Sequence, residues 1–304
     1  MQMLHNNYVQ IFGHGPTWDI HIHTSQTTPN DFFTESKRAT ELVWSNKQGT
    51  VYVMYSGGVD SEYTLKLFHS LGMSVIPVII KLNPSYNQHD IKYAFDFCQA
   101  HRFNPLVIDI DFDEFVKSGK IIDIAQSAQL CVYQYAATLY ATEKIDGTVI
   151  CSTGEPAVRL DPTTRQWSVI FDEYNYVFFK YWQERGIVGT PFFNIYTPEM
   201  MFAFISDPRV DDLVNFRVPG KQGHQSSKWL IYNRHSGFNH RERPKYHGYE
   251  NIENSEISKH DNILEFEKFK AYWDGAVQQE YHTFMSRIAD PVISLCSDNI
   301  TKIT

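Results

Sequence analysis

A pair of glycines separates an apolar strand from a helix in the first quarter of the chain. Residues 50 to 56, TVYVMYS, are rich in β-branched and aromatic types, which favour a buried strand. Residues 61 to 71 have the apolar spacing of a helix, and Gly72 is suited to end it. The intervening SGGVD leaves room only for a tight turn. Strand, glycine turn and helix in immediate succession are the unit from which parallel α/β folds are built.

The same alternation continues to about residue 152. Further strands are predicted at residues 74–82 (SVIPVIIKL), 105–111 (PLVIDID) and 147–152 (GTVICS). Helical apolar spacing occurs at residues 31–47, 89–103 and 121–144. Strands separated by helices of this length form right-handed βαβ units. The sequence therefore predicts an α/β fold, a parallel sheet with flanking helices.

The regular alternation is lost after Cys151, where prolines separate short aromatic segments. Residues 262 to 289 regain helical spacing and are predicted to form a closing helix. The predicted organisation is an N-terminal extension over residues 1–34, an α/β domain over 35–160, and a mainly helical, locally basic region over 161–304 that would hold the acceptor substrate.

Composition excludes several classes of protein. A chain of 304 residues that is 42% hydrophobic is long enough to bury one large core or two modest ones. A net charge of -8 argues against a uniformly basic nucleic-acid coat. The four cysteines form no CxxC pair, so the usual zinc and iron-sulfur spacings are missing. Without a leader pattern or a long apolar run, we expect a cytoplasmic protein with no membrane partner.

The turn at residues 56 to 61 has the chemistry of a phosphate-binding site. Backbone amides of a glycine-rich turn and of the first helical turn point at one spot, where the helix dipole also favours an anion. Ser56 and Ser61 supply hydroxyl donors, and Asp60 can hold a magnesium ion beside them. The hexapeptide lacks the Gly-Lys-Ser/Thr ending of a Walker A loop, and it is not GxGxxG. A plain strand-to-helix connection is the alternative.

SGGxDS after the first strand resembles the PP-loop ATP pyrophosphatases, the adenine nucleotide alpha-hydrolase-like superfamily. The resemblance covers about residues 35 to 160. It implies a Rossmann-like sheet of the HUP type, with ATP and Mg²⁺ as cofactors and cleavage of ATP to AMP and pyrophosphate. It also implies that backbone around Ile80 to Leu82 meets adenine. The loop that would grip the pyrophosphate portion of ATP consists of Ser56, Gly57, Gly58, Val59, Asp60 and Ser61.

A second candidate loop follows the fourth predicted strand, where the sequence reads CSTGEPAVRLD. Ligands of open α/β sheets bind at this carboxyl edge. The loop resembles that of asparagine synthetase-like members, which implies that Gly154 contacts the nucleotide and that Glu155 is a second magnesium ligand or holds the acceptor. The usual acidic pair is not reproduced, because Pro156 follows Glu155 and the next acid is Asp161. An ordinary surface loop is the alternative.

Positive charge is concentrated between residues 215 and 248, among several aromatic residues. Cations here can neutralise charge on a leaving pyrophosphate. Lys228 and Arg243 are the first candidates, with Arg159 and Lys245 behind them. The segment can instead grip an RNA or DNA acceptor through its cations and rings, or it is a solvated basic face.

DIHIHT, residues 19 to 24, resembles the opening metal motif of PHP-type phosphoesterases. Metal sites of that family need further histidine and aspartate clusters on later strands, whereas this chain soon enters the PP-loop unit. An ordinary strand with alternating histidines is the simpler interpretation.

Features that the sequence lacks narrow the range of PP-loop reactions to be expected of this chain. No four-cysteine zinc site or CxxC pair supports a 7-cyano-7-deazaguanine synthase or a CxxC-dependent tRNA thiolase. About fifty residues before the loop leave no room for the glutaminase domain of asparagine synthetase, so nitrogen would come from free ammonia, an amine substrate or a separate subunit. Likeness to the synthetase half of asparagine synthetase predicts an AMP- and pyrophosphate-forming ligase that adenylates a carboxylate or carbonyl oxygen of a small-molecule acceptor. Its candidate catalytic residues are Asp60, Glu155, Lys228 and Arg243.

Two other functions remain open from the sequence. One is ATP-dependent thiolation or amination of a nucleic-acid base, in which Cys151 is of interest as a sulfur carrier and a separate subunit supplies the sulfur. The other is a non-catalytic adenine-nucleotide-binding module. The intact Ser56, Asp60 and Ser61 weigh against the second.

Overall fold

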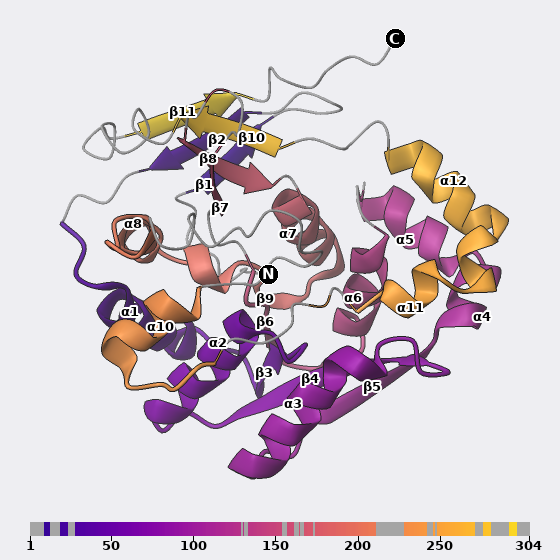
Figure 1. Cartoon of the computed structure of the whole chain (residues 1–304), viewed down its shortest axis with the longest axis horizontal. Helices are drawn as coiled ribbons and strands as arrows, with labels where there is room; N and C mark the ends of the chain where they lie inside the picture. The colour runs from indigo at the N-terminus through magenta and orange to yellow at the C-terminus, as the bar shows by residue number, and fades with distance from the viewer. Residues whose placement is uncertain are drawn as a thin grey trace.

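A five-stranded sheet in which every neighbouring pair is parallel forms the centre of the computed structural model (Figure 1). The described residues are 9–12, 19–23, 28–128, 130, 133–153, 157–160, 164, 167–172, 174–210, 228–241, 246, 248–270, 276–280 and 292–296. The strands of this sheet are β3 (Val51–Met54), β4 (Val75–Asn83), β5 (Leu106–Asp111), β6 (Thr148–Ile150) and β9 (Val188–Thr190). The predicted α/β class is confirmed.

The strand order is β5-β4-β3-β6-β9. Of these five strands, β3 comes first in the sequence and lies at the centre of the sheet. The direction of winding reverses between β3 and β6. This is the Rossmann-like arrangement, in which the crevice outside the carboxyl ends of the two central strands is the usual ligand site. Tyr55 and then SGGVDS follow β3, and the residues after β6 begin with Cys151.

Alternating strand side chains face two separate cores. Val51, Val53 and Tyr55 contribute to the core on one face, and Met54 to the core on the other. The first face is covered by α1 (Phe32–Ser45), α2 (Val59–Ser70), α3 (Gln88–His101), α8 (Pro198–Ile205) and α10 (Trp229–Ser236). The second is covered by α4 (Phe112–Lys117), α5 (Lys120–Ala128), α6 (Gln134–Thr142), α7 (Tyr174–Arg185), α11 (Glu250–Glu253) and α12 (Asp261–Lys270). The result is a three-layer α/β body.

Two predicted helices differ from the structure. The stretch expected from residue 121 to 144 is two helices, α5 and α6, separated at the buried residues Leu130 and Tyr133. The closing helix expected from 262 to 289 ends at Lys270, and Ala276–Glu280 instead form strand β10. That part of the prediction is wrong because AVQQE pairs antiparallel with β8 (Trp167–Asp172), a long-range contact that outweighs the local helical spacing.

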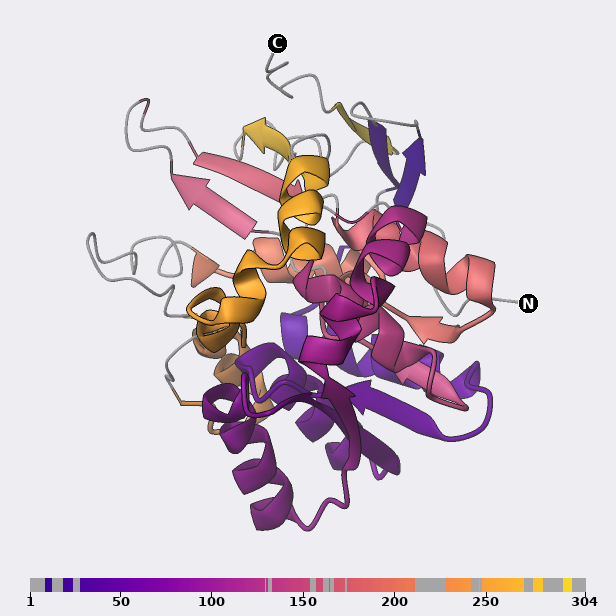
Figure 2. The same ribbon diagram turned by 90° about the vertical axis from the view of Figure 1, so that its right-hand side faces the viewer.

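Residues 161 to 304 contribute strands as well as helices. Besides β9, which completes the parallel sheet, they supply β8, β10 and β11 (Val292–Cys296). One antiparallel sheet has the order β10-β8-β7, with β7 at Ala157–Leu160, and a second joins β1 (Val9–Phe12), β2 (Asp19–His23) and β11. Both antiparallel sheets lie at the end of the molecule opposite α3 (Figure 2). DIHIH is β2, so the strand expected there is confirmed.

The short 3₁₀ turns are Phe193–Ile195 and Glu256–Lys259. None of the helices in the described ranges is both long and apolar enough to cross a membrane.

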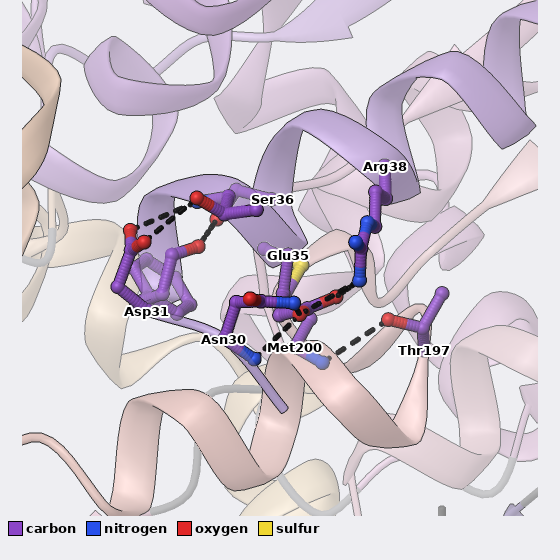
Figure 3. Close-up of polar contacts among 9 residues, drawn as sticks. Asn30, Asp31, Glu35, Ser36, Arg38, Thr197 and Met200 are labelled. Atoms are coloured by element: carbon purple, nitrogen blue, oxygen red, sulfur yellow. Dashed lines mark hydrogen bonds and ion pairs between the residues drawn. The ribbon is translucent and has the colours of Figure 1, made fainter. Parts of the chain in front are cut away.

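The start of α1 is fixed by a group of partly buried polar contacts (Figure 3). Asp31 caps the helix by accepting from the Thr34 amide at 3.0 Å. Glu35, which is 1% exposed, accepts from the Asn30 amide at 2.7 Å and from Arg38 at 3.1 Å. The first ring of α1, Phe32, meets rings of both α8 and α10 at 5.2 and 5.8 Å. These contacts orient α10, which carries part of the candidate site.

Candidate functional site

The loop after β3 turns through a conformation that only glycine takes easily. Gly57 has φ +92, and a Cβ atom there would lie 3.0 Å from the Ala94 amide nitrogen and 3.3 Å from the Asp90 carbonyl oxygen. The loop therefore packs directly on the backbone of α3. Gly58 is the N-cap of α2 and makes no side-chain capping hydrogen bond. The amide nest predicted from the sequence would lie at this helix start, and it stays a prediction.

The serine hydroxyls of the loop bond to its own backbone. Ser56 Oγ accepts from the Gly58 amide at 3.3 Å, and Ser61 Oγ donates to the Gly58 carbonyl at 3.1 Å. Both contacts are at or beyond the usual length for such bonds, and an anion in the nest can replace them.

A cavity of about 360 Å³ opens over this loop at the point where the strand order reverses. Its walls come from the ends of β3, β4 and β6, the starts of α2 and α3, and part of α6 and α7. Of the predicted site residues, the walls include Ser56, Gly58, Asp60, Ser61, Ile80, Leu82 and Lys228. Gly57 and Val59 complete the loop without lining the cavity. The structure thus brings together segments that are far apart in the sequence.

Asp60 is held by two side chains from the start of α10. Lys228 Nζ lies 3.1 Å from Asp60 Oδ2, and the Tyr232 hydroxyl donates to Asp60 Oδ1 at 2.5 Å. Asp60 is 26% exposed and Lys228 17%, so the pair is partly shielded from water. A cation predicted from local charge alone therefore lies against the aspartate of the motif. Tyr232 was missed, although it lies four residues after Lys228 and on the same helix face.

Aromatic rings hold α10 against α2 behind this pair. Tyr63 stacks on Tyr232 with ring centroids 4.4 Å apart. Glu62 Oε1 lies 2.6 Å from Lys66 Nζ and 3.2 Å from His240 Nδ1. Burial, together with the charge of Lys66, lowers the pKa of His240 to about 3, so the imidazole is neutral. Burial likewise lowers the pKa of Lys66 to about 8. The Tyr232 ring thus packs against α2 while its hydroxyl bonds to Asp60.

The strand edge predicted to meet adenine also lines the cavity, but it already has a partner. Asn87 Oδ1 accepts from the Leu82 amide at 2.9 Å, and Asn87 Nδ2 donates to the Ile80 carbonyl at 2.9 Å. Nothing in the local sequence indicates this role for Asn87, because an asparagine before a helix is ordinarily a cap.

The end of β6 forms the opposite wall. Ser152 Oγ donates to Thr64 Oγ1 at 2.9 Å, which ties this strand end to α2. Cys151 lines the cavity but is 3% exposed, and burial raises the pKa of its thiol far above the usual range. A protonated, enclosed thiol is a poor nucleophile, which weighs against Cys151 as a sulfur carrier.

Several predicted residues cannot be compared with the structure. Gly154, Glu155, Arg243 and Lys245 lie outside the described residues, and Arg159 is placed only as backbone in β7. Within the described part of the chain, no group of three or more His, Cys, Asp and Glu residues is suited to hold a metal ion.

Asp90, in the first turn of α3, is a second carboxyl group in the cavity wall. Burial and, to a smaller extent, the charge of Glu250 raise its pKa to about 7. Glu250 itself lies 2.8 Å from His89, so the carboxyl pair is only partly neutralised. Near neutral pH Asp90 is therefore divided between its protonated and charged forms.

This pKa shift makes stability depend on pH. The folded chain holds the Asp90 proton more tightly than the unfolded chain does, so folding loses stability as pH rises from about 4 to about 7, and the penalty is complete above 7. Asp90→Asn removes the titration. In urea unfolding, we expect the free energy of unfolding of the variant to gain about 4 kcal/mol relative to the wild type between pH 4 and pH 8. Asp96→Asn, at an exposed position of α3, is the control for lost charge, and an equal gain there would contradict the prediction.

No model of a known protein family matches the chain, and a search of curated proteins finds no match. Function must therefore be inferred from the residues and geometry of the site.

Proposed function

We propose that this chain is a PP-loop ATP pyrophosphatase of the HUP type and acts as a ligase. ATP would adenylate a carboxylate or carbonyl oxygen of an acceptor, with release of pyrophosphate, and a nitrogen nucleophile would then displace AMP. One observation carries the proposal: the SGGVDS loop lies at the strand reversal of a Rossmann-like sheet, and its Asp60 faces Lys228 at 3.1 Å.

The loop is suited to the phosphate chain of ATP. The first amides of α2 would supply donors to phosphate oxygens, and Gly57 lets the loop pack closely on the backbone of α3. Lys228, held at the edge of the nest, can stabilise charge that develops on the leaving pyrophosphate. Positioning and charge neutralisation of this kind need no protein nucleophile.

Asp60 also fits a magnesium ion. Mg²⁺ in nucleotide sites is usually bound through one or two carboxylates together with substrate phosphates, and Asp60 supplies one such carboxylate at the cavity. A magnesium ion bound there would neutralise phosphate charge. Lys228 and Tyr232 each contact one Asp60 oxygen, so a bound metal would either share the carboxylate with them or replace one of these contacts. Glu155 remains the proposed second ligand.

The cavity is of a size suited to a small organic ligand, since such pockets usually measure about 300 to 1,000 Å³. Val78, Ile80, Leu82 and Ile91 give it one apolar wall, and Tyr249 adds an aromatic ring. Apolar and aromatic surfaces accept the flat face of a purine. The base would lie beyond the end of β3, with its phosphates over the loop.

The test is release of pyrophosphate and AMP from ATP by the full chain. ATP and magnesium are offered with pooled amino acids and other small acids plus ammonia, and separately with pooled tRNA and DNA. We expect release with the small-acid pool, inhibited by inorganic tripolyphosphate, which competes for the nest. Release only with nucleic acid would replace the ligase by base modification. ATP binding without release from any pool would overturn catalysis and leave a binding module.

A further inference from the structure

Strand β4 extends beyond its neighbour β3, and among the described residues one of its backbone edges has no strand partner there. The Tyr55 amide donates to the Val78 carbonyl at 2.8 Å, at the end of β3. Further along the same strand, the Ile80 carbonyl and the Leu82 amide bond instead to the side chain of Asn87. Both residues line the 360 Å³ cavity. A single carboxamide therefore completes this edge of the sheet.

Asn87 occupies the N-cap position of α3, yet its side chain makes no capping hydrogen bond to the helix in the described structure. Asparagine is common at this position because its oxygen ordinarily accepts from the helix amides. Here the side chain is 7% exposed and turned toward β4, where both bonds measure 2.9 Å. The local sequence does not explain that orientation. The edge of β4 beyond β3 does explain it, since its buried backbone groups need hydrogen-bond partners.

A carboxamide presents an acceptor beside a donor, which is the pattern of N1 and the 6-amino group of adenine. We propose that Asn87 occupies the place of the adenine edge in the free chain, and that ATP binds by displacing it from the Leu82 amide and the Ile80 carbonyl. This inference rests on the proposed function. It makes Asn87 a positioning residue that sets both the affinity of the site and the base it accepts.

The displaced side chain has a space to enter. Asn87 also lines a second cavity, of about 430 Å³, whose walls include Gln88, Ile91, Lys92, Phe95 and Val107. Asn87 and Ile91 belong to the walls of both cavities. Rotation of one carboxamide from the first cavity toward the second exposes the strand edge without moving the sheet.

The same geometry predicts which base is accepted. Hypoxanthine placed like adenine has a carbonyl oxygen in place of the amino group and an N–H in place of N1. It would set an acceptor against the Ile80 carbonyl and a donor against the Leu82 amide, leaving both backbone groups unpaired. ATP should therefore bind at least about 10-fold more tightly than inosine triphosphate.

Calorimetric titration of the full chain tests the displacement. ATP, inosine triphosphate and inorganic tripolyphosphate are each titrated into the wild type, Asn87→Ala and Asn83→Ala. Asn83 is a matched control, because its carboxamide also ends β4 but bonds to Asp109 at 3.1 Å. We expect Asn87→Ala to bind ATP about 3-fold to 10-fold more tightly, since no internal competitor remains, with tripolyphosphate unchanged and Asn83→Ala like the wild type.

A second measurement uses only the wild-type chain, so its result does not depend on whether a variant folds. The side-chain amide protons of Asn87 are followed by NMR in the wild type, and ATP should shift them and speed their exchange, whereas tripolyphosphate should leave them as in the free chain. Tripolyphosphate binding with Asn87 undisturbed by ATP would overturn this inference alone. Failure of both tripolyphosphate and ATP to bind would overturn the proposed function and this inference with it.

Discussion

Replacing Asp60 by alanine is expected to abolish measurable pyrophosphate release from ATP while leaving the fold intact. Asp60 is the only carboxylate of the SGGVDS loop, and it lies at the cavity with Lys228 3.1 Å away. Its loss removes the proposed metal ligand and leaves Lys228 without its ion pair. Removing one preorganised electrostatic group commonly costs about 100-fold to 1,000-fold in turnover, and here two groups are affected. Turnover is measured as pyrophosphate release under saturating ATP and magnesium.

Two companion variants sharpen that experiment. Asp60→Asn keeps an acceptor for the Tyr232 hydroxyl but lacks the charge, so it separates metal binding from a structural contact. Asp96→Ala removes a carboxylate from an exposed position on α3 and should behave as the wild type. We expect Asp60→Asn to be as inactive as Asp60→Ala, with both variants unfolding within a few degrees of the wild type. Full activity in Asp60→Asn would remove the aspartate from the proposed metal site.

Gly57→Ala is expected to weaken binding of ATP and of inorganic tripolyphosphate alike, by about 10-fold to 100-fold. A side chain at φ +92 is strained by about 1 to 3 kcal/mol, and the added Cβ would lie 3.0 Å from the Ala94 amide nitrogen. The backbone of α3 cannot yield cheaply, so the loop itself must shift. A displaced loop no longer directs its amides to one spot. Titration calorimetry with both ligands measures the loss.

Gly72→Ala is the matched control for Gly57→Ala. Gly72 ends α2 with φ +70, and a Cβ atom there meets nothing within 4 Å among the described residues. The substitution therefore adds similar backbone strain without a collision near the loop. It should lower the melting temperature slightly and leave both affinities unchanged. Equal losses of affinity in the two variants would mean that general destabilisation, and not the shape of the nest, governs binding.

The parallel sheet could be predicted because its pattern is local. Runs such as VIPVII and LVID are rich in branched apolar residues, and the helices between them have regular spacing, so each element is specified by its own residues. The loop at Ser56 to Ser61 was found for the same reason. Lys228 was selected only because it lies among cations and rings, and its place beside Asp60 depends on how α10 packs.

The elements that were missed depend on distant partners. Strand β9 is only VGT, too short to have a periodicity, and it is a strand because β6 pairs with it. Strand β10 has helical spacing but pairs with β8. Tyr232 and Asn87 carry no local sign of their contacts, since one faces a loop far away in sequence and the other completes a strand edge. Local sequence patterns predict such long-range tertiary contacts poorly.

The ion pair between Asp60 and Lys228 sets one negative group against one positive group at the cavity. In the proposed reaction, binding would exchange partners: the metal ion would bind the Asp60 carboxylate, and phosphate oxygens would bind the Lys228 ammonium group. Magnesium alone would leave Lys228 without a phosphate partner, and the nucleotide alone would leave Asp60 without a metal ion. By thermodynamic linkage, magnesium and nucleotide must each strengthen the binding of the other by the same factor. In the proposed reaction, such a site would discriminate against free phosphate and sulfate, which bring no cation of their own, and would bind the metal complex of the nucleotide as one unit.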